Sequence, residues 1–158
     1  MPSFKIIEES ELFGGLSRDS LDRIATLCQE AEYPRGATIF VEHSPAQRLY
    51  ILEYGLVTLR IETPAGEEKM MVTAIRDRGE VFGWSALVEP HIYTSTAVCL
   101  EPCKVAAVDG PALLRMLEEN PAEGFLVMRR LAALVASRLR KAQAALTSAL
   151  TPGLISHG

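Results

Sequence analysis

The 158-residue sequence has no long apolar run, few aromatic residues and three cysteines. No run approaches the roughly 18–20 apolar residues that a membrane-spanning helix needs. An odd number of cysteines in a short chain argues against a disulfide framework and for a reducing compartment. The net charge of −4 gives no overall attraction to nucleic acid. We therefore expect a soluble, cytoplasmic protein, whose 48% apolar residues suffice for a buried core.

The sequence also lacks the motifs of common catalytic and metal sites. We find no nucleophile–base pair, paired carboxylates, P-loop or metal-ligand spacing, so we expect a protein that is not an enzyme. Three cysteines cannot supply the four thiolates of an iron–sulfur cluster, and haem needs an axial ligand. His43 and His157 fall in a loop and in the tail, and only His91 falls near the loop considered below. No metal and no cofactor are predicted.

Helix is predicted at the start of the chain and short strands after it. Apolar residues at helical spacing, with Ser17 as N-cap, predict helix over residues 8–33, ended by Pro34-Arg35-Gly36. Pro64-Ala65-Gly66 is expected to form a turn between strands. Strands are expected at residues 37–41, 49–53, 56–62, 67–76, 93–101 and 104–109, with a non-strand stretch at 81–92. Short strands with turns about every ten residues predict an antiparallel sandwich or barrel.

The chain is expected to end in helix. Pro111 fits the first turn of a helix that runs to Glu119, and Asn120-Pro121 separates it from a second helix at about 122–150. That helix carries apolar residues at alternating spacings of three and four, as in a coiled-coil seam. The seam comprises Phe125, Met128, Ala132, Val135, Leu139, Ala142 and Leu146. The first turns are expected to pack on the protein's own barrel, and the distal half predicts a homodimer. The predicted units are 1–120 (barrel with N-terminal helices), 121–150 (dimerisation helix) and 151–158 (tail).

The same helix is basic. A solvated face is the ordinary explanation, and docking on an acidic partner or anionic surface is the alternative. The residues concerned are Arg129, Arg130, Arg138, Arg140 and Lys141.

The order of these elements resembles the catabolite activator and cyclic-nucleotide-binding superfamily. The residues that carry the resemblance are Leu12-Phe13, Leu16-Ser17, Gly36, Tyr50-Ile51-Leu52, Gly55, Gly66-Glu67-Glu68, Gly79-Glu80-Val81-Phe82-Gly83, Thr96-Ala97-Val98, Leu100-Glu101 and Lys104-Val105. The resemblance implies a mainly β fold with flanking helices. The barrel would be a double-stranded β-helix, jelly-roll-like, of about eight strands, with an N-terminal helix and a long C-terminal dimerisation helix.

The family's functional centre is a phosphate-binding cassette. The resemblance places it at Phe82, Gly83, Trp84, Ser85, Ala86 and Leu87, facing Ser95, Thr96 and Ala97. A glycine before a short helix lets an anion approach free backbone N–H groups. In members that bind cyclic nucleotides, a glutamate follows the glycine and an arginine precedes the Thr/Ser-Ala pair. This sequence has Trp84 and Ser95 at those positions.

These two replacements change the expected ligand. Loss of the glutamate removes a charged hydrogen bond worth about 1.5–3 kcal/mol. Loss of the arginine costs several kcal/mol more, because a buried phosphate keeps no bidentate partner. Arg76, Arg78 and His91 are not expected to substitute for it, so tight binding of cyclic AMP or cyclic GMP is not predicted.

Two interpretations of the pocket remain open. It binds a smaller, less charged or more aromatic ligand against Trp84, or Trp84 fills it as core. The first predicts a sensory, regulatory domain that signals through its dimer helix to a protein partner. The second predicts a ligand-free homodimerisation or adaptor module. The family's transcription factors continue into a helix-turn-helix, whereas Thr151-Pro152-Gly153 breaks this helix near the end of the sequence, so a stand-alone domain without direct DNA binding is expected.

Overall fold

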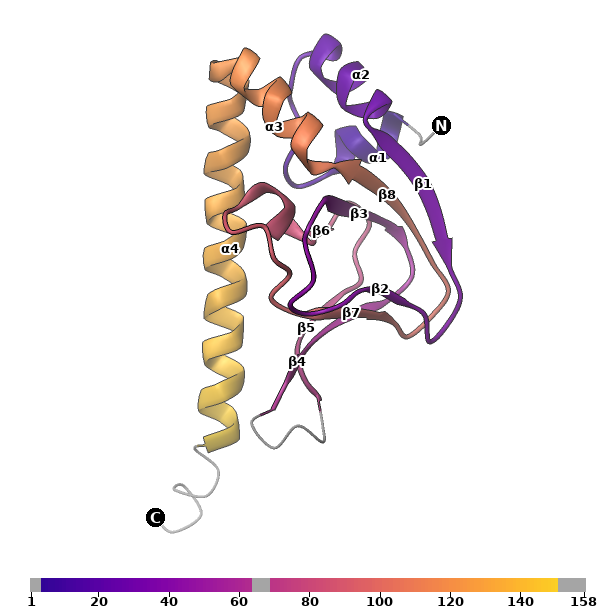
Figure 1. The fold of residues 1–158 in the computed structure, drawn as a ribbon, viewed down its shortest axis with the longest axis vertical. Helices are drawn as coiled ribbons and strands as arrows, with labels where there is room; N and C mark the ends of the chain where they lie inside the picture. The colour runs from indigo at the N-terminus through magenta and orange to yellow at the C-terminus, as the bar shows by residue number, and fades with distance from the viewer. Residues whose placement is uncertain (1–3, 64–68, 151–158) are drawn as a thin grey trace.

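The computed structural model describes residues 4–63 and 69–150, and its long C-terminal helix lies along one side of a β-barrel (Figure 1). The turn expected at Pro64–Gly66 and the tail at 151–158 lie outside the described residues. The elements in chain order are α1 (Phe4–Glu9), α2 (Arg18–Thr26), β1 (Cys28–Tyr33), β2 (Thr38–Phe40), β3 (Arg48–Tyr54), β4 (Val57–Glu62), β5 (Lys69–Ile75), β6 (Val81–Phe82), the 3-10 helix η1 (Trp84–Leu87), β7 (Thr96–Cys99), β8 (Cys103–Asp109), α3 (Gly110–Glu119) and α4 (Pro121–Leu150).

The strands form two antiparallel sheets. In the described part of the chain, one four-stranded sheet has the order β1-β8-β3-β6 and the other has the order β2-β7-β4-β5. Strands close in sequence are thus distributed over two facing sheets, as in a jelly roll. The predicted class, mainly β with flanking helices and a long terminal helix, is confirmed.

Two apolar clusters hold these layers together. The first fills the space between the helices and the β1-β8-β3-β6 sheet, with fully buried Phe13, Ile24 and Leu49. The second lies inside the barrel and contains a stack of aromatic rings. The centroids of Phe40 and Tyr93 are 3.9 Å apart, and those of Tyr50 and Phe82 are 5.3 Å apart. The aromatic stack packs against Gly83 of the predicted cassette and forms the base of that region.

The predicted helix over residues 8–33 is wrong at its C-terminal end. Ser17 does cap a helix, accepting a hydrogen bond from the Ser20 N–H, but that helix ends at Thr26. Cys28–Tyr33 is instead strand β1, paired residue by residue with β8 from Cys28–Val108 to Tyr33–Cys103. Pairing with a strand 70 to 80 positions away outweighs the local helical spacing, because the ladder satisfies the backbone groups of the segment that face β8. The two-residue strand β6 likewise lies in the stretch expected to hold no strand.

Helix α4 begins and ends close to its predicted limits and has two different halves. Its buried residues are Gly124, Val127, Leu131 and Arg138, all within the first 18 positions. A Cβ at Gly124 would lie 2.5 Å from the Leu117 carbonyl oxygen, so glycine permits the close crossing of α3 and α4. Beyond Arg138 the helix is almost entirely exposed. None of the helices among the described residues combines the length and the apolarity that crossing a bilayer requires.

Candidate ligand pocket

The cassette backbone is shaped by Gly83. This residue has φ 75°, in the left-handed region, and turns the chain from β6 into η1. A Cβ there would lie 3.1 Å from Cδ2 of Tyr50 and 3.3 Å from the carbonyl oxygen of Arg48. Both the dihedral angle and the close packing therefore favour glycine at this position.

The structure brings together some of the predicted cassette residues. A cavity of about 20 Å³, here called the cassette cavity, lies over Gly83 and is bordered by Trp84, Ser85 and Ser95. Such a volume holds about one water molecule. Five other predicted residues are buried in the core and do not border it: Phe82, Ala86, Leu87, Thr96 and Ala97. The Thr96 hydroxyl accepts a hydrogen bond from the Glu42 N–H at 2.9 Å.

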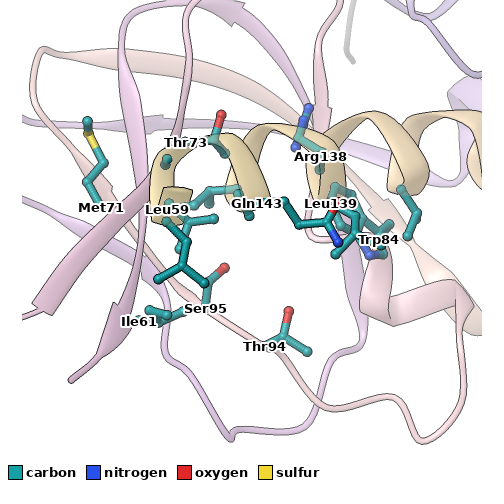
Figure 2. A pocket seen from close by; sticks show the side chains of 15 residues that line it. Leu59, Ile61, Met71, Thr73, Trp84, Thr94, Ser95, Arg138, Leu139 and Gln143 are labelled. Atoms are coloured by element: carbon teal, nitrogen blue, oxygen red, sulfur yellow. The ribbon is translucent and has the colours of Figure 1, made fainter. Parts of the chain in front are cut away.

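A much larger cavity adjoins this space. It measures about 580 Å³, lies between strands β4 and β5 and helix α4, and is here called the helix cavity (Figure 2). Its walls are mostly apolar, with Leu59 and Met71 from the barrel and Leu139 from α4. The two cavities share Leu59, Trp84, Thr94 and Ser95. Sequence reasoning identified the cassette part of this region and missed the larger part, whose walls meet only in the folded chain.

Arg138 is the residue that connects the cassette to α4. Its side chain is 8% exposed, and its Nη2 donates a hydrogen bond of 2.9 Å to the Val81 carbonyl oxygen. Nη2 lies 3.6 Å from Oε1 of Glu11, and Cζ lies 5.1 Å from the centroid of the Trp84 ring. Nη1 is buried without a hydrogen-bond partner. Figure 2 shows the guanidinium pointing away from Thr94 and Ser95.

Burial is the main cause of the pKa shifts of Arg138 and Glu11. Desolvation lowers the pKa of Arg138, and the nearby Glu11 carboxylate opposes that effect. Desolvation also raises the pKa of Glu11, which is opposed by the hydrogen bond from the Val81 N–H and by the charge of Arg138. Glu11 accepts that hydrogen bond at 2.7 Å. The Arg138 charge is thus already engaged by groups of the protein itself.

The expectation of a solvated basic face on α4 is wrong for two residues. Besides the buried Arg138, Arg130 donates from Nη1 to the carbonyl oxygens of Leu12, at 3.1 Å, and of Gly14. A signal for Arg138 exists in the sequence, because spacings of four, three and four link Val127, Leu131, Leu134 and Arg138 in one stripe. The remaining basic residues, Arg129, Arg140 and Lys141, are exposed.

The predicted dimer seam is largely open in the single chain. Phe125 is 68% exposed, Leu139 57% and Leu146 52%. Met128 and Ala132 are also exposed, whereas Val135 and Ala142 are half-buried. Val135, Leu139, Ala142 and Leu146 border the helix cavity as well. The self-association predicted from this seam stays a prediction.

Metal-binding residue types occur outside the pocket. Among the described residues, a group that could hold an ion consists of Glu42, His43 and Glu62 at an exposed edge of the barrel. The Glu42 carboxylate already accepts a hydrogen bond of 3.0 Å from the Glu62 N–H. The three cysteines are buried free thiols, and desolvation raises the pKa of both Cys28 and Cys99 to about 12. A thiol with that pKa stays protonated at neutral pH and is a poor metal ligand.

The barrel, the glycine turn and the flanking long helix define a jelly-roll domain with a terminal helix packed along it. Residues 30–120 match the model of the family described as the cyclic nucleotide-binding domain. The chain belongs to this family.

Individual relatives agree with this assignment. The chain is 32% identical to the cyclic AMP receptor protein of Thermus thermophilus over 133 residues, covering 84% of this chain and 59% of that protein. It is 26% identical to the CRP-like cAMP-activated global transcriptional regulator of Mycobacterium tuberculosis over 137 residues, covering 87% and 58%. A crystal structure of a protein from Geobacter metallireducens, assigned as cyclic nucleotide-binding, superposes with a TM-score of 0.76 at 33% identity, covering 88% and 99%. The chain therefore spans less than two thirds of the two curated regulators.

Proposed function

We propose that this chain is a regulatory domain that does not bind cyclic AMP or cyclic GMP tightly and that transmits the state of its pocket through α4. The observation that carries the proposal is the cassette cavity, whose volume of about 20 Å³ has room for one water molecule and not for a cyclic phosphate. Trp84 borders this space, packs against the first apolar cluster and lies beneath the Arg138 guanidinium.

The charges around the pocket support the same proposal. Arg138 is the only charged side chain among the described residues that border either cavity. Its guanidinium is engaged by Glu11, Val81 and Trp84 and does not replace an arginine at position 95. A phosphate buried there would lose its hydration without gaining a cationic partner, which costs several kcal/mol.

The role proposed for α4 rests on two of its features, its contact with the cassette and its exposed apolar seam. The helix holds the cassette through Arg138 and carries the exposed apolar residues of the predicted seam. We expect a second copy of the chain to cover this seam, so that the pocket and the dimer interface share one rigid element. We expect a protein partner in the cytoplasm to respond to the resulting change. We do not expect this chain to bind DNA directly.

A calorimetric titration tests the nucleotide part of the proposal. We expect no one-to-one binding of cyclic AMP or cyclic GMP tighter than about 10 µM, which corresponds to roughly −7 kcal/mol. The double variant Trp84→Glu with Ser95→Arg restores both charges and is expected to gain affinity. Tight binding by the natural chain would overturn the proposal, and no gain in the folded double variant would show that the missing charges are not the cause.

A ligand-free homodimerisation or adaptor module is the second candidate function. The packing of Trp84 against the first apolar cluster favours it. The two functions differ in one measurement, because a small molecule that binds only the folded state must raise the melting temperature. Under the adaptor hypothesis, no small molecule has this effect.

A further inference from the structure

The helix cavity lies where an occupant would contact both halves of the proposed sensor. Strands β4 and β5 supply one wall, through Leu59, Ile61 and Met71, and α4 supplies another, through Leu139 and Leu146. Its volume of about 580 Å³ falls within the range of small-molecule pockets. An occupant would therefore contact both the barrel and the distal half of α4.

The chemistry of the walls limits the class of occupant. The polar groups that border the cavity are the hydroxyls of Thr73, Thr94 and Ser95 and the amide of Gln143, besides Arg138. Nη2 of Arg138 is bonded to Val81 and lies 3.6 Å from Oε1 of Glu11, and its Nη1 is buried without a hydrogen-bond partner. An anionic ligand would be desolvated beside a cation whose charge the Glu11 carboxylate already offsets, whereas an apolar ligand would gain from every wall. The hydroxyls and the amide provide one or two hydrogen bonds for orientation.

Trp84 adds a preference for rings. Its indole borders the cavity and is held in place by Arg138. An aromatic ligand can pack on this ring with an offset or edge-to-face geometry, worth about 0.5–1.5 kcal/mol beyond its apolar area.

The volume also distinguishes a small molecule from a second polypeptide. An α-helix is about 10–12 Å across, so two turns of it occupy roughly 850–1200 Å³. That exceeds the helix cavity. A partner helix can cover the exposed faces of the seam, such as Phe125 and Met128, which are 68% and 38% exposed, without filling the cavity.

We propose that the helix cavity binds an uncharged, largely apolar small molecule, aromatic in part, that contacts Trp84 and the distal half of α4. The inference rests on the proposed function, because it names the ligand class of the same pocket. It places the ligand beside the cassette cavity, against the helix.

A matched pair of fluorescent probes tests the ligand class. N-phenyl-1-naphthylamine is uncharged and apolar, and 1-anilinonaphthalene-8-sulfonate is the same ring system with a sulfonate. Trp84 is the only tryptophan of the sequence, so energy transfer from it reports binding nearby. We expect saturable binding of the uncharged probe, one per chain, and an affinity for the sulfonate at least about tenfold weaker, or about 1.4 kcal/mol. Equal affinity for the two probes would overturn the uncharged class.

Substitutions on adjacent positions of α4 test the site. Ala142 and Ala145 border the cavity, whereas Ala144 is exposed and does not. Ala142→Phe fills the cavity and is expected to weaken the uncharged probe at least about tenfold, while Ala144→Phe leaves it within about twofold. Ala145→Phe gives a second test at an exposed position, should Ala142→Phe fold poorly. Equal effects of Ala144→Phe and the cavity variants, or no saturable binding by the natural chain, would overturn the site.

Two parallel measurements separate the remaining outcomes. Sedimentation of the chain with and without probe shows whether the probe displaces a second copy, and displacement would assign the cavity to the dimer interface and overturn the proposal. The cyclic AMP titration is run on the same sample. Tight nucleotide binding contradicts the proposed function, whereas absence of both nucleotide and probe binding contradicts only the ligand site and ligand class inferred here.

Discussion

The two halves of α4 differ in environment more than in composition. From Pro121 to Arg138 the helix buries Gly124, Val127 and Leu131 against α3 and the first apolar cluster. From Leu139 to Leu150 it still carries leucines and alanines, but these are almost all exposed. Position relative to the barrel therefore decides what an apolar residue does. The proximal half holds the fold together, and the distal half keeps apolar surface for a ligand or a second copy.

The largest expected effect is at Leu131, which is 2% exposed. Leu131→Ala should lower the free energy of unfolding by about 3 kcal/mol, because it removes buried methyl groups and leaves a cavity. Leu150→Ala, at a position 66% exposed, should change it by less than about 0.5 kcal/mol. Urea unfolding at one fixed protein concentration measures both. Similar losses in the two variants would contradict the division of the helix.

Arg138 comes next. Arg138→Ala should cost about 2 kcal/mol, because the Val81 carbonyl and the Glu11 carboxylate lose their partner and Trp84 loses a packing surface. Arg140→Ala is the matched control on the exposed face and should be close to neutral. The same unfolding experiment compares them. If the two arginines prove equally dispensable, Arg138 does not anchor the helix.

Glu123 fixes the start of the proximal half. Its carboxylate accepts hydrogen bonds from the Ser17 N–H at 2.8 Å, the Ser20 hydroxyl at 2.7 Å and the Asn120 amide at 2.8 Å. The Ser17 backbone hydrogen bond, then that of Ser20, lowers its pKa below 4.5. A lowered folded-state pKa means that this stabilisation is present above the unfolded-state pKa and is lost as pH falls through the folded-state value.

Glu123→Gln should therefore cost about 1 kcal/mol at neutral pH, where the carboxylate is charged. The difference between the variant and the natural chain should shrink as pH falls below 4.5, the ordinary pKa of the group. Unfolding at a series of pH values checks this. A difference that does not change with pH would show that charge plays no part.

The smallest effect on the folded monomer is expected on the seam. Phe125→Asp should change the unfolding free energy of the monomer by less than about 0.5 kcal/mol, because the ring is exposed. It should weaken self-association at least about tenfold, since a charge would enter an apolar seam. Ala133→Asp, an exposed neighbour outside the seam, is the control. Sedimentation equilibrium measures the self-association of both variants. Unchanged association of Phe125→Asp would show that Phe125 does not lie in the interface.

Local patterns predicted the barrel and the long helix, and distant contacts account for what was missed. Alternation in Val57–Glu62 and the Gly83 turn are properties of a few neighbouring residues. The strand character of Cys28–Tyr33 depends on β8. The charge of Arg138 predicts a solvated side chain, but its place on the apolar stripe of α4 buries it. The helix cavity has walls from β4, β5 and α4, and no single segment of sequence carries a sign of it.

Val81 ties the order of synthesis to the completion of the fold. It lies on β6, at the edge of its sheet, and its N–H is bonded to Glu11 while its carbonyl is bonded to Arg138. These partners lie 70 positions before it and 57 positions after it. A nascent chain that has emerged only through residue 120 holds every described strand but still lacks the donor for that carbonyl. We expect this edge of the barrel to close late, when the proximal half of α4 has left the ribosome.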